Sequence, residues 1–182
     1  VARAVVPQRH GGTYMIVDFG RRRTGIAIVS GEVLRFTSTV DVGGNTLSQA
    51  VQKHFNVSAE EADNIKNEKG FARYKENKEL LETLISTVSV LRDEIRRHYN
   101  YWNNHTGEDE QDHQQIDKII LCGGSANLAG LSEYLASDLN VVVDVANVWT
   151  NTFSLNEFIP DIEYRHSLAY ATSVGLALKG SH

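Results

Sequence analysis

The sequence has very few of the residues that cross-link or stiffen small secreted proteins. Its 182 residues include one cysteine, Cys122, and two prolines. A single cysteine excludes an internal disulfide and a cysteine-based zinc site. Because Cys122 ends the apolar run IDKIILC, we expect a buried strand thiol rather than a nucleophile. This cysteine usage fits a cytoplasmic protein.

Long apolar runs and an excess of positive charge are also missing. No stretch has the length of a membrane-spanning helix, and no signal-peptide pattern opens the chain. The net charge of −5 excludes the basic footprint of a broad nucleic-acid binder. The hydrophobic fraction of 41% and charged fraction of 23% are those of a globular domain. We therefore expect no nucleic-acid partner and no direct membrane span.

The two ends of the sequence indicate a piece of a longer protein. The opening VARAVVPQRH does not start with Met and reads like the end of a helix or a linker. The final GSH reads like a tag remnant. We expect residues 1–12 to be a linker.

Alternating β-forming residues predict a three-stranded antiparallel meander after this linker. The first strand covers residues 13–20, the second is GIAIVS with Thr24 at its start, and the third is VLRFTSTV. Glycines mark the turns between them.

Helical patterns fill the middle of the chain. We predict a helix with Asn45 or Thr46 as its N-cap, and a second helix capped by Ser58, with Glu61 completing a capping box and Gly70 at its end. Residues 76–104 carry the longest pattern, with apolar residues three and four apart. This helix could serve a coiled coil or partner, but its short stripe favours packing on its own domain.

The second half alternates strands with helices. After a polar segment at 105–115, which we expect to be an exposed loop, the prediction is a strand KIILC, a helix at 125–139, a strand VVVDV, an irregular stretch at 146–165 and an apolar closing helix at 167–180. His105 and His113 match no metal-site spacing. This order predicts an α/β domain with a helical insertion.

The turn DFGRRRT is the first candidate for chemistry. A tight turn between strands can aim backbone N–H groups at a phosphate, and Gly20 permits close approach. Thr24 can donate its hydroxyl, whereas Asp18 would act through Mg²⁺ or its waters. Taken alone, the motif fits a plain hairpin tip at least as well.

Three further segments are candidates of the same modest strength. Gly43 and Gly44 precede a helix, whose N-terminus offers free N–H groups and a positive dipole end; the alternative is a simple turn. Asp63 and Lys66 share one helical face and could hold ribose and adenine, or form a surface ion pair. Gly123-Gly124-Ser125 could receive a ring or phosphate, or be an ordinary βα loop.

Taken in order, these segments resemble the second half of the actin-like ATPase (ribonuclease H-like) fold. Within that superfamily the chain is most similar to the PilM family of type IV pilus assembly. The resemblance is carried by VDFGRRRTGIAIVSGEVLRFTSTVDVGGNTLSQAV, SAEEADNIK, LRDEIRRHYNYW, KIILCGGSANLAGLSEYL and SVGLALKG, which together cover nearly the whole chain.

The resemblance implies an ATP site with Mg²⁺, DFGRRRT being its second phosphate loop and Gly123-Gly124-Ser125 its adenosine motif. The residues expected to contact nucleotide are Asp18, Gly20, Thr24, Gly43, Gly44, Asp63, Lys66, Gly123, Gly124 and Ser125. Asp18 is expected to reach the metal directly or through its waters.

The resemblance also implies an organisation and partners. Residues 13–57 and 115–182 would form the actin-like α/β subdomain, and 58–114 a mainly helical inserted subdomain. The chain contains a single D-x-G turn of this type, so it matches the second lobe alone, joined by the linker to a missing first lobe. The whole protein would be a cytoplasmic scaffold, peripheral to the inner membrane through partners. These are a PilN-like pilus protein bound by the missing lobe, other pilus proteins or further copies of itself.

Two departures keep alternatives open. The family usually has Glu where Asp63 stands, and three successive arginines are unusual in a phosphate loop. The alternatives are a lobe of a sugar or acetate kinase-like phosphotransferase, or a PilM-like binding module that no longer binds nucleotide. We expect the isolated chain to be catalytically inactive and Arg21–Arg23 to face mostly solvent or a partner.

Overall fold

A five-stranded mixed sheet forms the centre of the molecule, as seen in a computed structural model that describes residues 1–8, 11–71, 78–104, 114–154 and 156–180. The strand order is β3-β2-β1-β4-β5. The strands are β1 (Thr13–Phe19), β2 (Thr24–Ser30), β3 (Val33–Val40), β4 (Lys118–Cys122) and β5 (Val143–Val145). The first three form the predicted antiparallel meander, while β4 pairs in parallel with both β1 and β5.

The register of the sheet brings the predicted loops to one edge. Phe19 pairs with Thr24 where β1 turns into β2, and Asp18 pairs with both Gly25 and Cys122. The ends of β1 and β4 therefore lie side by side. β1 and β4 are apolar almost throughout and occupy the buried middle of the sheet, as expected for strands covered on both faces.

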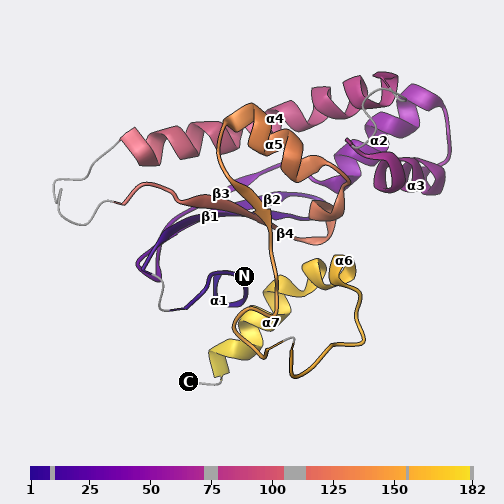
Figure 1. Ribbon diagram of the computed structural model, residues 1–182. Coiled ribbons are helices and arrows are strands. Elements are labelled where there is room, and N and C mark those ends of the chain that lie inside the picture. The colour runs from indigo at the N-terminus through magenta and orange to yellow at the C-terminus, as the bar shows by residue number, and fades with distance from the viewer. Residues whose placement is uncertain (9–10, 72–77, 105–113, 155, 181–182) are drawn as a thin grey trace.

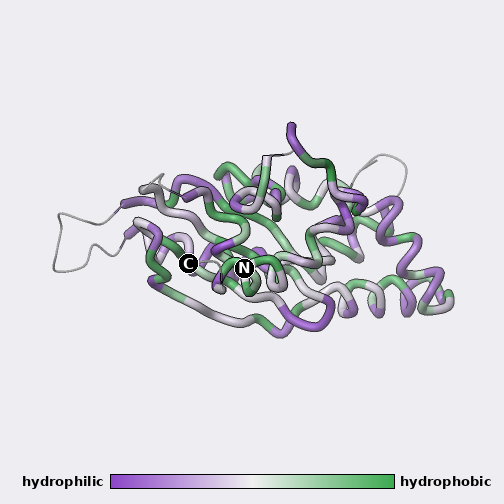
Figure 2. Tube along the Cα trace, turned by 90° about the horizontal axis from the view of Figure 1, so that it is seen from below, coloured by the Kyte–Doolittle hydropathy of each residue, from purple (hydrophilic) through white to green (hydrophobic). Residues whose placement is uncertain are grey.

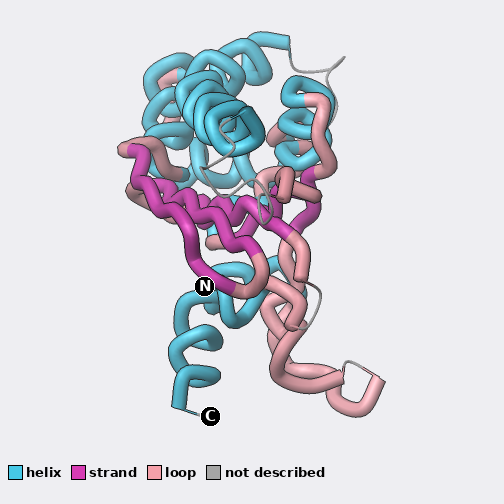
Figure 3. The backbone as a smooth tube through the Cα atoms, turned by 90° about the vertical axis from the view of Figure 1, so that its left-hand side faces the viewer, coloured by secondary structure: helices cyan, strands magenta, loops and turns pink. Residues whose placement is uncertain are grey.

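Helices lie on both sides of this sheet (Figure 1; Figure 3). One side carries α2 (Gly44–Phe55), α3 (Ala59–Lys69), α4 (Lys78–Asn104) and α5 (Leu131–Leu139). The other side carries α1 (Ala2–Val5), α6 (Tyr164–Ser167) and α7 (Ala171–Ala177). Figure 2 shows the molecule from below, with the layer of α1, α6 and α7 towards the viewer. α1 and α7 are in contact, and a Cβ atom at Gly175 would lie 2.9 Å from the Val1 nitrogen.

The long helix α4 packs on its own domain, which confirms the simpler of the two interpretations of its pattern. Its apolar stripe is buried, and includes Leu80, Leu84, Val88, Leu91 and Ile95. Near its end the ring of His98 lies 4.7 Å from that of Phe36 on β3. Of the helices in the described ranges, none combines the length and apolar character required to cross a bilayer.

Helix ends agree with the sequence in one case and differ in another. Ser58 caps α3, because its Oγ accepts the Glu61 N–H at 3.2 Å, and Gly70 follows the helix with φ 45°. The predicted caps of α2 were wrong: the N-cap is Gly43, and the helix already includes Asn45. Thr46 lies at the third helical position, where its Oγ1 accepts the Gly43 N–H at 3.4 Å.

Two predicted helices are interrupted. The segment 125–139 is a 3₁₀ turn at Gly124–Asn127 followed by α5, because Leu128 adopts extended backbone after the first piece and Gly130, with φ 75°, precedes the second. The closing segment consists of α6, a 3₁₀ turn at Leu168–Tyr170, α7 and a last 3₁₀ turn at Leu178–Gly180. Most of the predicted loop at 105–115, with His105 and His113, lies outside the described residues, as does most of the GSH end.

A substitution at the middle of α4 should show how far the fold depends on this helix. Leu91 is fully buried, so Leu91→Ala should lower the free energy of unfolding by about 2–5 kcal/mol through lost contacts and a cavity. Val90 is its neighbour and 52% exposed, so Val90→Ala should change it by less than about 0.5 kcal/mol. Urea unfolding measures both, and equal effects would contradict this packing.

Candidate functional site

Three of the predicted segments meet at the carbonyl oxygen of Gly20. This oxygen accepts the backbone N–H of Gly44 at 3.0 Å and the hydroxyl of Ser125 at 3.1 Å. The next carbonyl, of Arg21, accepts the N–H of Asn45 at 2.8 Å. The phosphate-loop candidate, the start of α2 and the turn after β4 therefore form one cluster.

Glycines allow these segments to approach so closely. A Cβ atom at Gly43 would lie 2.5 Å from the carbonyl carbon of Arg22, and one at Gly44 would overlap the Ser125 hydroxyl. Gly123 has φ 87°, and a Cβ there would lie 2.5 Å from Asp18 Oδ1. A side chain at any of these three positions would displace backbone or polar atoms, so only glycine fits without a change.

Asp63 and Lys66 form the fourth part of the cluster. Lys66 is only 7% exposed, so the interpretation as an ordinary surface ion pair was wrong. Its ammonium donates to Ser48 Oγ at 2.7 Å, to Asp63 Oδ1 at 2.8 Å and to Gly44 O at 3.4 Å. An ammonium has three N–H donors, so Lys66 is fully engaged in joining α3 to α2.

The charges around Asp63 set its ionisation. Partial burial alone would raise its pKa, but hydrogen bonds from Lys66 and Ser48, with the positive charges of Lys66 and Arg21, bring the pKa below its usual 3.8. The Asp63 side chain remains 46% exposed. The group therefore carries a negative charge at neutral pH and stays accessible from outside.

Asp18 and Thr24 lie at the ends of the strands that flank the turn. Burial raises the pKa of Asp18. Asp18 also lines a cavity of about 550 Å³ on the α1 side of the sheet. Thr24 is fully buried and donates its hydroxyl to Val42 O at 2.6 Å. A phosphate contact from this hydroxyl would require it to leave Val42.

Free backbone donors occur at the turn rather than at the helix start. The N–H groups of Gly44 and Asn45 are bound by Gly20 and Arg21, so the expectation of free donors at the N-terminus of α2 was wrong. Across the described ranges, the N–H groups of Arg21, Arg22 and Arg23 have no hydrogen-bond acceptor. Three successive unbonded N–H groups can form an anion site.

The sequence reasoning missed three side chains that build the cluster. Asn45 accepts a hydrogen bond from Arg21, Ser48 links Asp63 and Lys66, and Asn127 Nδ2 donates to Gly124 O and Arg165 O. Ser48 had a detectable signal, since it is a polar residue next to Leu47 on the buried face of α2. Asn45 and Asn127 had none.

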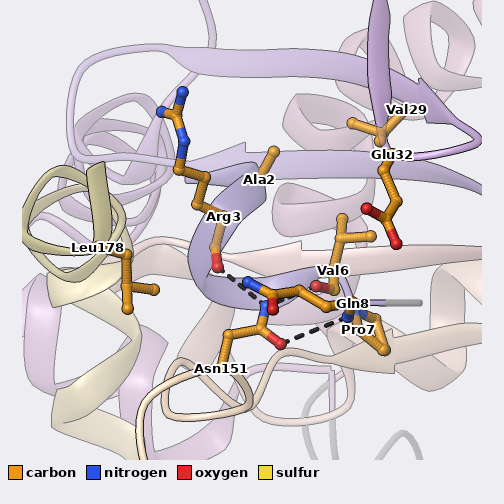
Figure 4. Close-up of a pocket in the computed structure, with 9 residues that line it drawn as sticks. All are labelled: Ala2, Arg3, Val6, Pro7, Gln8, Val29, Glu32, Asn151 and Leu178. Atoms are coloured by element: carbon orange, nitrogen blue, oxygen red, sulfur yellow. Dashed lines mark hydrogen bonds between the residues drawn. The ribbon is translucent and has the colours of Figure 1, made fainter. Parts of the chain in front are cut away.

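A separate pocket of about 290 Å³ lies between α1, the β2–β3 turn and Leu178 of the last 3₁₀ turn (Figure 4). Asn151 closes one side of it, donating to Arg3 O at 2.9 Å and Val6 O at 2.6 Å. The pocket shares no residue with the cluster around Gly20. It therefore does not belong to the predicted site.

The family follows from a match along almost the whole chain. A sequence model described as type IV pilus assembly protein PilM matches residues 1–181. The chain belongs to the PilM family. No individually curated protein matches it significantly.

Solved structures give this PilM-family chain the fold of the actin-like ATPases. A PilM–PilN type IV pilus biogenesis complex is similar with TM-score 0.72 and 19% identity, over 94% of this chain and 47% of that one. EutJ, an ethanolamine utilization protein from Carboxydothermus hydrogenoformans, gives 0.64 and 22%, over 97% and 51%. MreB5 of Spiroplasma citri bound to ADP gives 0.73 and 14%, over 99% and 57%. The chain spans about half the length of these structures.

The contact between α2 and the turn after β4 can be tested by a double-mutant cycle. Gly44→Ala should lower the free energy of unfolding by roughly 1–3 kcal/mol, because the new methyl group overlaps the Ser125 hydroxyl. In a Ser125→Ala background the cost should fall by about 1 kcal/mol. Chemical denaturation measures all four proteins, and strictly additive effects would mean that the two positions do not touch.

The ion pair on α3 predicts a pH dependence. Since the pKa of Asp63 is lowered on folding, its stabilisation is fully present above its unfolded pKa and is lost as the pH falls through the folded value. The difference in unfolding free energy between the wild type and Asp63→Asn should therefore shrink below about pH 4. Glu68→Gln, at an exposed position of α3, is the control. A constant difference across the acid range would contradict the assignment.

Proposed function

We propose that this chain is the second, nucleotide-binding lobe of a PilM-family protein that serves as a cytoplasmic scaffold in type IV pilus assembly. The observation that carries the proposal is that the Gly20 turn, the start of α2, the turn after β4 and the Asp63–Lys66 pair form one cluster, within a chain that matches the PilM family over residues 1–181. Residues 13–57 and 115–182 would form its α/β subdomain and 58–114 its helical insertion.

The donors at the turn suit the phosphates of ATP. The unbonded N–H groups of Arg21–Arg23 provide an anion site, and the exposed carboxylate of Asp63 can accept ribose hydroxyls. A Cβ atom at Gly124 would meet only Ala169, at the ordinary contact distance of 3.6 Å, so this glycine leaves room beside the turn for a flat ring. A solved MreB5 structure with the same fold is bound to ADP, which supports nucleotide as the ligand class.

Asp18 is the residue that would hold Mg²⁺. Its carboxylate fits a hard cation, which prefers oxygen ligands and keeps several waters. Among the described residues, Asp18 belongs to no group of three or more His, Cys, Asp or Glu side chains that could hold a metal ion. Phosphate oxygens and waters would therefore complete the coordination. When bound, Mg²⁺ would neutralise phosphate charge.

A binding module without nucleotide is the second candidate, and one observation favours it. The Lys66 ammonium, the Thr24 hydroxyl and the first N–H groups of α2 are all engaged within the protein. In this alternative the cluster only stabilises the lobe. A PilN-like partner, bound through the rest of the protein, fits both candidates, since PilN accompanies PilM in the similar complex.

Calorimetric titration with ATP and Mg²⁺ tests the proposal. The full-length protein should bind ATP, and Asp18→Asn should weaken this binding. The 182-residue chain alone should bind much more weakly, because half of the phosphate contacts would come from a preceding lobe. Tight binding by the isolated chain, at roughly micromolar Kd, would contradict the two-lobe proposal. A full-length protein that assembles with its pilus partners but binds no ATP would establish the binding module instead.

A further inference from the structure

The turn at Arg21–Arg23 places three exposed guanidinium groups beside the cluster around Gly20. The other cation of this cluster is Lys66. Lys66 is buried and donates to Ser48, Asp63 and Gly44. A phosphate at the turn would therefore meet arginine rather than lysine. Arginine stays charged at all physiological pH values and can bind phosphate through two parallel N–H groups.

Arg21 differs from the two arginines that follow it. Its Nε donates to Asn45 Oδ1 at 2.9 Å, and the Asn45 N–H donates back to Arg21 O at 2.8 Å. These reciprocal hydrogen bonds fix both the backbone and the side chain of Arg21 against α2. In the part of the chain that the structure describes, the side chains of Arg22 and Arg23 have no hydrogen-bond or ion-pair partner.

The anchored guanidinium is held at the start of α2 by Asn45. Its positive charge contributes to the lowered pKa of Asp63. Only its Nε is engaged by Asn45, so the two terminal nitrogens remain available to an anion. Asp18, two residues before Gly20 and beside Gly123, also lines a cavity with Thr37 and Thr39 on the side of the sheet that carries α1.

We propose that Arg21, held by Asn45, binds the phosphates of the nucleotide and supplies much of the positive charge otherwise taken from a divalent cation. ATP binding would then persist without Mg²⁺, while Arg22 and Arg23 would contribute little. This inference rests on the proposed function. Asn45 acts in it as a positioning residue, because it reaches the phosphate only through Arg21.

Calorimetric titration of the full-length protein with ATP, in excess Mg²⁺ and in EDTA, separates these roles. Wild type should lose less than about tenfold in Kd when EDTA replaces Mg²⁺. Arg21→Ala should lose about tenfold or more in EDTA, the usual scale for a hydrogen bond to a charged group. Arg22→Ala, which removes the same charge one residue away, should stay within about threefold of wild type.

Further variants keep the test independent of folding. Arg21→Gln retains a donor for Asn45 without the charge, and should behave like Arg21→Ala. Asn45→Ala frees the guanidinium and should have an intermediate effect in EDTA. Thermal unfolding of each variant provides the check on the fold.

The outcomes distinguish this inference from the function on which it rests. If wild type binds ATP only with Mg²⁺, or if Arg21→Ala equals Arg22→Ala, the role of Arg21 is overturned and nucleotide binding stands. If wild type binds no ATP in either condition, both fail.

Discussion

The structure of the candidate site depends on one oxygen atom. The Gly20 carbonyl accepts hydrogen bonds from Gly44 and from Ser125, which are contributed by segments far apart in the sequence. A buried carbonyl has two lone pairs, and both are used here. Because each hydrogen bond holds a different loop, the relative positions of the β1–β2 turn, α2 and the turn after β4 are set together. The glycines at the contact points are a consequence, since any side chain there would separate the loops.

Much of the fold could be predicted from local patterns. The alternation in residues 13–40 predicts the meander, and the apolar stripe of residues 80–95 predicts the packed helix α4, because each pattern follows directly from which side chains are buried. The interruptions of the predicted helices were harder to predict. Gly130 interrupts a helix by adopting positive φ, and the same letter in the sequence is compatible with a helix interior. The N-cap of α2 is fixed by contact with a distant turn, which no local pattern reports.

The meeting of the candidate segments could be predicted from the sequence, but the bonding of their polar groups could not. The order of four weak motifs identified the segments that meet, yet several of their polar groups are used internally. Lys66 illustrates the reason. On its helix it is one of two lysines, and only the approach of Ser48 and Gly44 from α2 makes it a buried, fully bonded cation. Sequence spacing shows which residues share a face, whereas tertiary contact decides which donors remain free.

Long-range hydrogen bonds hold the layer of segments on the α1 side of the sheet, and two of them reach the candidate site. Asn151 binds the carbonyl groups of α1, and Tyr164 binds Val145 and Ala146. Asn127 joins the turn after β4 to the start of α6, and the Gly123 N–H binds Leu168 O at 3.1 Å. The position of the Gly123–Ser125 turn is therefore set by the layer below the sheet as well as by the cluster around Gly20.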